Sequence, residues 1–203
     1  MISADEALDR LRQGNRRFTA NTPIAGALLT ERRPAELATS QSPFATILGC
    51  SDSRVPAEII FDQGLGDLFV IRVAGNIIAP SLVGSVEFAA ARCDTPLVVV
   101  LGHTQCGGIM ATIEELESPG ATPSRNLQSI VNRIRPSVQG LFDAGLRGDA
   151  LVKQAVRANI RASANHLRHG SRILETLIAD KGMRVVGAEY SLETGVVDFF
   201  DGV

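Results

Sequence analysis

Three short runs of apolar residues lie in the first half of the chain, at residues 44–48, 68–73 and 97–101. Each run is too short for a typical helix, and the second and third are rich in β-branched side chains, which favour extended backbone. We therefore predict a buried strand at each of the three runs.

The segments between these runs have helical spacing. We expect a short helix after Pro56 through Phe61, a longer one over 81–92 and another over 109–116. Strands that alternate with helices pair in parallel, and helices then cover both faces of the sheet. The pattern predicts an α/β fold with a central, mostly parallel sheet flanked by helices.

The N-terminal segment has the signature of an amphipathic helix. Ser3 and Glu6 match a capping box, and apolar residues recur near helical spacing on one side after it. Residues 21–43 carry several prolines and no sustained periodicity, so we expect a connecting arm with one short helix over 31–38. This arm, together with the first helix, is expected to pack on a partner subunit.

The last third of the chain predicts more helix and then two strands. A Pro- and Gly-bearing stretch at 118–124 precedes a helix that starts at about Arg125, and 148–181 reads as a long helical region interrupted at His169 and Gly170. A fourth strand over 184–190 and a fifth over 196–200 are separated by a turn. The fifth strand is expected to pair antiparallel with the fourth, as a hairpin.

Composition favours one domain spanning residues 1–203, since 203 residues with 45% hydrophobic content can bury a sizeable core. The formal charge of −2 gives no overall field that recruits nucleic acid or an anionic membrane. No apolar run approaches the roughly 18 residues of a membrane span, and the acidic N-terminus differs from a signal peptide. We expect a soluble, cytoplasmic protein that acts on a small molecule.

Candidate metal ligands follow two of the predicted strands. Cys50 follows the first strand, His103 follows the third, and Cys106 is three residues further on. Neighbouring parallel strands bring such positions together at one edge of the sheet. Two thiolates and an imidazole suit zinc, and catalytic zinc sites have three protein ligands and one open position. The pattern predicts one Zn²⁺ per subunit.

Asp52 and Arg54 alternate with Cys50, which places all three on one side of an extended stretch. The carboxylate has two possible roles. It can close the site as a fourth ligand, or, paired with Arg54, it can accept a hydrogen bond from a water on the metal and orient it.

Other cysteine, histidine and basic residues have simpler interpretations. We expect Cys93 to be a buried packing residue, and His166 and His169 to lie on a solvated helix face. A basic stripe is expected to face solvent or another subunit. It consists of Lys153, Arg157 and Arg161.

The two motifs, Cys50-x-Asp52-x-Arg54 and His103-x-x-Cys106, resemble those of the β-class carbonic anhydrases. Further segments resemble the corresponding segments of bacterial members; they lie at 11–18, 61–67, 72–76 and 84–88. The resemblance implies four parallel strands with one antiparallel strand added, and a homodimer or homotetramer. It also implies that Cys50, His103 and Cys106 bind zinc and that Asp52 and Arg54 form a catalytic pair.

The resemblance further implies a reaction and a substrate pocket. Zinc-bound hydroxide attacks carbon dioxide, bicarbonate is displaced by water, and the proton leaves to buffer. The residues that match the family's substrate-pocket positions are Gln41, Phe69, Phe88 and Gly107. A tyrosine of plant members is replaced by Phe88. The allosteric subgroup carries tryptophan at the Gln41 position, so the resemblance favours the plant-like subgroup with an accessible metal.

Three alternatives remain open at this point. A hydrolase of carbonyl sulfide or carbon disulfide would use the same ligands on the same scaffold. A zinc- or redox-responsive regulatory protein would use Cys50 and Cys106 as structural or oxidisable thiols, and the Asp52–Arg54 pair weighs against it. The last alternative is a purely structural subunit.

Overall fold

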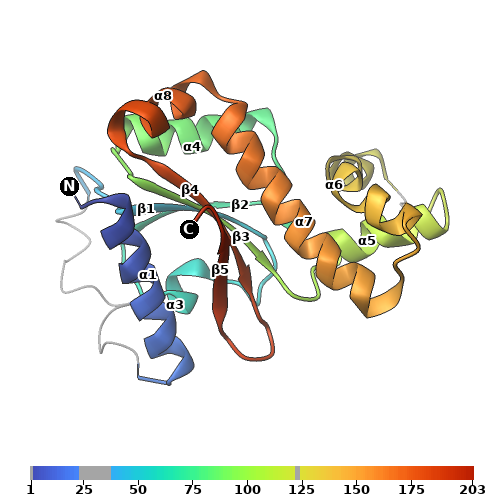
Figure 1. Cartoon of the computed structure of the whole chain (residues 1–203). Coiled ribbons are helices and arrows are strands. Elements are labelled where there is room, and N and C mark those ends of the chain that lie inside the picture. The colour runs from blue at the N-terminus through green and yellow to red at the C-terminus, as the bar shows by residue number, and fades with distance from the viewer. Residues whose placement is uncertain (1, 23–37, 122–123) are drawn as a thin grey trace.

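The computed structural model describes residues 2–22, 38–121 and 124–203 (Figure 1). Its centre is a five-stranded sheet in the order β2-β1-β3-β4-β5. The first four strands are parallel and β5 is antiparallel to β4, so the predicted α/β fold is confirmed. The strands are β1 (Ala45–Gly49), β2 (Leu68–Arg72), β3 (Leu97–His103), β4 (Arg184–Tyr190) and β5 (Val197–Asp201).

Helices connect these strands at the predicted places. They are α1 (Ala4–Thr19), α3 (Ala57–Ile60), the 3-10 turn η1 (Ala74–Asn76), α4 (Pro80–Arg92), α5 (Gly107–Glu117), α6 (Arg125–Asp143), α7 (Gly148–His169) and α8 (Arg172–Lys181). The expected interruption at Gly170 separates α7 from α8. The short helix expected over 31–38 and most of the connecting arm lie outside the described residues.

The boundary of β3 differs from the prediction. The strand was expected to end at Leu101, but it continues to His103 because Gly102 and His103 pair with Glu189 and Tyr190 of β4. The extension makes His103 part of the sheet, where its backbone is fixed on one side by a neighbouring strand.

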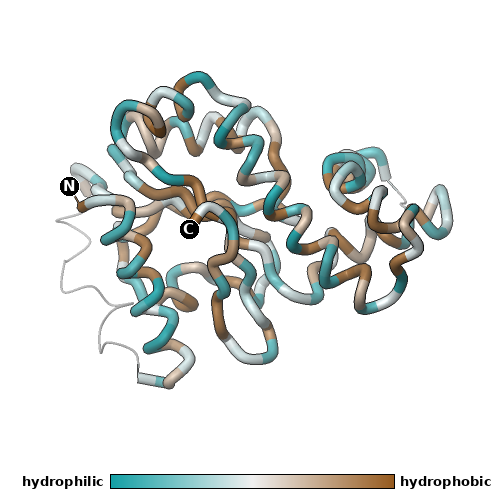
Figure 2. The backbone as a smooth tube through the Cα atoms, viewed as in Figure 1, coloured by the Kyte–Doolittle hydropathy of each residue, from teal (hydrophilic) through white to brown (hydrophobic). Residues whose placement is uncertain are grey.

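Apolar side chains alternate between the two faces of the sheet and make two hydrophobic cores. Ile47 and Val99 pack with α1 and α3 on one face, whereas Leu48 and Val100 pack with α4, α7 and α8 on the other. Figure 2 shows the hydrophobic residues concentrated along the strands and on the inner sides of these helices. Both faces are thus buried, as a parallel sheet requires.

The N-terminal helix is fixed at both ends. The Ser3 side chain accepts from the Glu6 N–H and the Glu6 carboxylate accepts from the Ser3 N–H, which confirms the capping box. Near the other end, the Asn15 side chain donates to the Gly195 carbonyl and accepts from the Val197 N–H. Gly14 lets α1 lie close to the end of α3, because a Cβ at this position would lie 1.7 Å from the carbonyl oxygen of Phe61.

The strand order places a topological switch point between β1 and β3. The chain runs from β1 to β2 on one side and from β3 to β4 on the other, which leaves a crevice at the carboxyl ends of β1 and β3. Helices α5 and α6 extend beyond the sheet beside this edge (Figure 1). The fold therefore presents one preferred position for a binding site.

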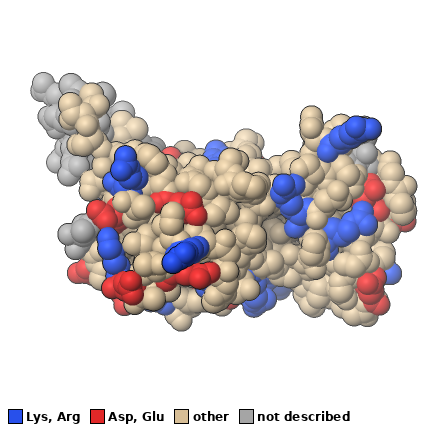
Figure 3. Space-filling view, turned by 90° about the horizontal axis from the view of Figure 1, so that it is seen from above, with Lys and Arg blue, Asp and Glu red and all other residues tan. Residues whose placement is uncertain are grey.

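Several surface expectations can be compared with the structure. His166 and His169 are exposed, as expected, but Cys93 is only partly buried because it forms the exposed C-cap of α4. Acidic and basic side chains interleave on the face seen in Figure 3. In the described ranges, no helix combines the length and apolar character needed to cross a bilayer.

Candidate metal centre

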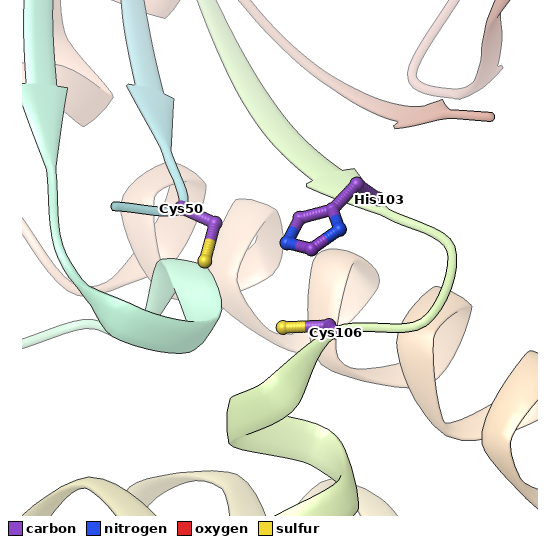
Figure 4. A group of neighbouring side chains, drawn as sticks. All are labelled: Cys50, His103 and Cys106. Atoms are coloured by element: carbon purple, nitrogen blue, oxygen red, sulfur yellow. The ribbon is translucent and has the colours of Figure 1, made fainter. Parts of the chain in front are cut away.

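Three predicted ligands converge at the switch point. Cys50 follows β1 directly, His103 is the last residue of β3, and Cys106 is the N-cap of α5. The pairing of Gly49 with Leu101 brings the two strand ends side by side. Figure 4 shows the three side chains pointing toward one common space, and their ligand atoms all lie within 4.8 Å of one another.

The imidazole of His103 presents one nitrogen to this space. Its Nδ1 lies 2.9 Å from the Thr104 carbonyl oxygen, which can only accept, so Nδ1 carries the proton and Nε2 has the free lone pair. Among the described residues, Nε2 has no hydrogen-bond partner although the side chain is fully buried. A buried nitrogen without a partner is costly unless a ligand occupies it.

The two thiols are held in different ways. The Gly75 N–H donates to Cys50 Sγ at 3.3 Å. Hydrogen bonds from the Cys106 thiol and from this N–H lower the pKa of Cys50, against the opposing effect of burial. The neighbouring Cys50 sulfur and burial raise the pKa of the Cys106 thiol, so the two thiols do not ionise independently.

Asp52 and Arg54 form a two-pronged ion pair at the rim of this cluster. Arg54 Nε donates to Asp52 Oδ1 at 2.9 Å and Nη2 to Oδ2 at 2.7 Å, while the Arg54 backbone N–H also donates to Oδ1 at 3.0 Å. These hydrogen bonds hold the pKa of the Asp52 carboxyl well below its ordinary range. Oδ2 lies 3.9 Å from His103 Nε2, so the carboxylate borders the space that the ligands share.

Two features that support the ligands were not predicted as site residues. Arg72, at the end of β2, donates to the carbonyls of Cys50 at 3.0 Å and Asp52 at 2.6 Å, which fixes the loop that carries both side chains. Between His103 and Cys106, Gln105 adopts φ 55°, a left-handed conformation that turns the chain sharply. The only sequence signal for Arg72 is its place in the segment 72–76.

A cavity of about 440 Å³ opens beside the cluster. Cys50 and Asp52 border it at the end of β1, and α5 and α6 line the rest with Gly107, several apolar residues and Glu114. Of the four predicted pocket residues, only Gly107 lines this cavity. Gln41 is exposed, while Phe69 and Phe88 pack on each other with ring centroids 6.1 Å apart.

The donor set fits zinc. Two sulfurs and one imidazole nitrogen match the ligand preferences of this borderline-soft ion, and the partnerless Nε2 of His103 is oriented for coordination. Among the described residues the cluster offers three ligands, which would leave a fourth tetrahedral position open, as in catalytic rather than structural zinc sites.

Comparisons with known proteins agree with this geometry. Residues 45–197 match the family described as Carbonic anhydrase. A carbonic anhydrase of Mycolicibacterium smegmatis is 39% identical over 188 residues, covering 93% of this chain and 89% of the relative. Carbonic anhydrase 2 of Mycobacterium tuberculosis is 39% identical over 186 residues, covering 91% of this chain and 87% of the relative.

Solved structures give the same result. The β-carbonic anhydrase CafA of Aspergillus fumigatus aligns with a TM-score of 0.77 at 25% identity, over 98% of this chain and 91% of that chain. The chain belongs to the β-carbonic anhydrase family, whose reaction is the reversible hydration of carbon dioxide. The resemblance expected from the two motifs is confirmed.

Proposed function

We propose that this chain hydrates carbon dioxide reversibly to bicarbonate and a proton at a zinc centre held by Cys50, His103 and Cys106. One observation carries the proposal. The free Nε2 of His103 and the two sulfurs face one space, and the Oδ2 atom of the paired Asp52 lies 3.9 Å from that nitrogen. A closed structural site would leave no role for a charged pair in this position.

Zinc, when bound, supplies Lewis acidity that makes a water molecule a good nucleophile near neutral pH. The ligands themselves are oriented by the protein. The Thr104 carbonyl fixes the tautomer of His103, and the Gly75 N–H orients Cys50. Ligand-orienting contacts of this kind set both the affinity and the electronic properties of a metal site.

Asp52 is proposed to orient the attacking water. Because Arg54 donates three hydrogen bonds to the carboxylate, Asp52 stays ionised and its oxygens keep a fixed direction. The remaining lone pair of Oδ2 can accept a hydrogen bond from water at the metal position. With Asp52 held by Arg54, the fourth metal position stays available to solvent, which supports the open-site, plant-like subgroup.

Carbon dioxide is proposed to bind in the adjoining cavity. Ala74, Gly107 and Ala111 give it a small, apolar lining next to the ligands. Such a lining suits an uncharged linear molecule, and the carboxylates of Asp52 and Glu114, which also line the cavity, disfavour the bicarbonate anion and so assist product release. The proton leaves to buffer.

Gln41, Phe69 and Phe88 are proposed to contribute to the pocket of a second copy of the chain. They do not line the cavity of their own chain, and Phe88 is 49% exposed. A β-carbonic anhydrase of Sordaria macrospora that aligns with a TM-score of 0.71 at 24% identity, over 82% of this chain and 84% of that chain, is tetrameric. We propose a homodimer or homotetramer.

Subunit mixing tests this assignment. Chains carrying His103→Ala and chains carrying Phe88→Ala are each expected to have low activity. Co-expression would restore activity, since a mixed dimer pairs an intact metal centre with an intact Phe88. If light scattering finds only monomers, or mixing restores nothing, the assignment of these residues to a partner is wrong.

A cytoplasmic location and a single domain over 1–203 remain part of the proposal. Cys50 and Cys106 are free and close together, and a reducing compartment preserves such thiols for metal binding. Measuring enzyme activity in separated cellular fractions would test the location.

The main test is stopped-flow hydration by the zinc-loaded protein from neutral to alkaline pH, with carbonyl sulfide as a parallel substrate. We expect carbon dioxide to be hydrated fast already at neutral pH. Activity confined to alkaline pH would indicate that Asp52 closes the metal site. Turnover of carbonyl sulfide alone would favour a hydrolase, and turnover of neither substrate would contradict the proposal.

A further inference from the structure

The 3-10 turn η1 holds an unusual piece of backbone against the metal centre. Its Gly75 N–H donates to Cys50 Sγ at 3.3 Å. Gly75 has φ 69° and the next residue, Asn76, has φ 42°, so two consecutive residues are left-handed and the second is not glycine. Such a conformation persists only where surrounding contacts hold it.

Helix α7 supplies these contacts from the side opposite Cys50. Asn159 Nδ2 donates to the Gly75 carbonyl at 2.8 Å, and Ser163 Oγ donates to the Asn76 carbonyl at 3.1 Å. Both side chains are buried, with exposed fractions of 3% and 5%. They lie one helical turn apart and therefore share one face of α7.

Gly75 cannot be held by a side chain of its own. A Cβ at this position would lie 2.7 Å from Ile134 Cδ1 of α6, so Ile134 would have to shift, and φ 69° would strain any residue with a side chain. Glycine has the greatest backbone freedom of any residue. Its orientation is therefore set by the hydrogen bonds at its two ends, one to Cys50 and one from Asn159.

We propose that Asn159 is a positioning residue of the metal centre, which holds the Gly75 N–H on Cys50 Sγ through the Gly75 carbonyl. The inference rests on the proposed function, since it takes Cys50 as a metal ligand. An N–H···S hydrogen bond withdraws electron density from sulfur, so it limits how strongly the thiolate donates to a metal and keeps the metal a better Lewis acid. It also fixes the direction of the sulfur lone pairs.

A merely structural role for Asn159 makes a different prediction. In that case the side chain would only satisfy a buried carbonyl, and its loss would lower stability without changing the sulfur. Ser163 is the matched control, because it makes the same kind of buried contact to the neighbouring carbonyl from the same helix face. Removing its hydroxyl leaves the Gly75 carbonyl contact in place.

The test uses the cobalt(II)-substituted protein, in which sulfur-to-metal charge transfer reports directly on the thiolates. We expect Asn159→Ala to move this absorption to lower energy, because the Cys50 sulfur becomes a stronger donor. We also expect zinc affinity to fall about 10–100-fold, because the sulfur loses its fixed direction and the site is no longer held ready for the ion. Ser163→Ala is expected to change the absorption and affinity much less, because the Gly75 carbonyl keeps its donor in that variant. Chelator competition measures the affinities without any activity assay.

A second variant keeps the test valid if Asn159→Ala does not fold. Asn159→Leu keeps the branched shape of the side chain but has no hydrogen-bond donor, so the same spectral shift is expected. An unchanged absorption in folded Asn159 variants, or equal shifts in the Asn159 and Ser163 variants, would overturn the proposal. Absence of the charge-transfer band in the unmodified protein would instead contradict the metal centre itself.

Discussion

Two clusters of charged and polar groups lie near the carboxyl ends of the strands, and they differ in how completely their members are paired. In the first, His103 Nε2 is buried without a hydrogen-bond partner in the described part of the chain. In the second, Arg157 of α7 donates to Glu189 at 2.7 Å and to Asp198 at 2.5 Å, and its guanidinium lies 4.4 Å from the centre of the Phe200 ring.

The difference separates a binding site from a structural network. A buried polar atom without a partner costs free energy, and His103 Nε2 also shares its space with the sulfurs of Cys50 and Cys106, so the combination indicates a metal ligand. Arg157 was expected to belong to a solvated or subunit-facing stripe, but it is only partly exposed and ties α7 to β4 and β5. Both clusters contain charged groups, so charge alone does not distinguish them. They differ in whether each buried polar atom has a hydrogen-bond partner.

Removing a ligand is expected to have the largest effect. Cys106→Ser should abolish hydration and weaken zinc affinity by more than the roughly 10–100-fold that loss of an outer contact costs. Cys93→Ser is the matched control, because Cys93 lies at the end of α4 outside the cluster. Metal analysis and stopped-flow assays of both variants measure the effect, and equal losses in the two would argue against the assigned ligands.

Removing the charge of Asp52 is expected to have the next largest effect. Asp52→Asn keeps the shape but loses the carboxylate that Arg54 holds, so kcat/KM should fall about 10²–10⁴-fold, the range of a positioned proton acceptor. Zinc content should stay unchanged. Asp198→Asn makes the same chemical change in the second cluster and should leave kcat/KM near that of the unmodified protein.

The pH dependence follows from the lowered pKa of Asp52, of which Arg54 is the main cause. Arg54→Met removes that cause, so the pKa rises toward the ordinary carboxyl value and Asp52 is protonated at higher pH. The loss of activity on the acid side should therefore shift upward in a pH–rate profile. Arg161→Met, at an exposed position on α7, should leave the profile unmoved.

The same pKa shift affects stability with a defined sign. A carboxyl whose pKa is lowered by folding stabilises the protein above its unfolded-state pKa, and this contribution is lost as pH falls through the folded-state value. Acid unfolding of Arg54→Met should begin at higher pH than that of the unmodified protein. An identical acid transition would show that the pair contributes nothing measurable to folding.

Breaking the second cluster is expected to have the smallest effect on activity. Arg157→Ala leaves the buried Glu189 without its main cation, so the free energy of unfolding should fall by about 1–3 kcal/mol. Denaturant titration measures this loss. Zinc affinity and kcat/KM should stay unchanged, and a drop in either would mean that the network also supports the metal centre.

The sequence predicted the sheet well because each strand carries a local signal. The runs at 44–48, 68–73 and 97–101 are short and apolar, and the parallel pairing follows from the helices between them. The candidate ligands Cys50 and His103 were brought together by the same reasoning, since residues at the carboxyl ends of neighbouring parallel strands lie side by side.

Contacts between distant segments were not predictable. Arg72 donates to the carbonyl of Cys50, 22 residues away, and Asn159 donates to that of Gly75, 84 residues away. Nothing in the local sequence indicates either contact. The end of β3 was placed too early because pairing of Gly102 and His103 depends on β4. Partial exposure of Cys93 likewise reflects how α4 ends rather than the residue type.

The origin of the proposed ligands in separate strands has a consequence for the folding equilibrium. Cys50 and His103 come together only when β1 and β3 are paired, so an unfolded chain offers an ion at most isolated thiols and imidazoles. Zinc would then bind the native state in preference to the unfolded one, so the free energy of unfolding would rise with the concentration of free zinc. Above the dissociation constant, each tenfold increase in free zinc should add about 1.4 kcal/mol to the free energy of unfolding.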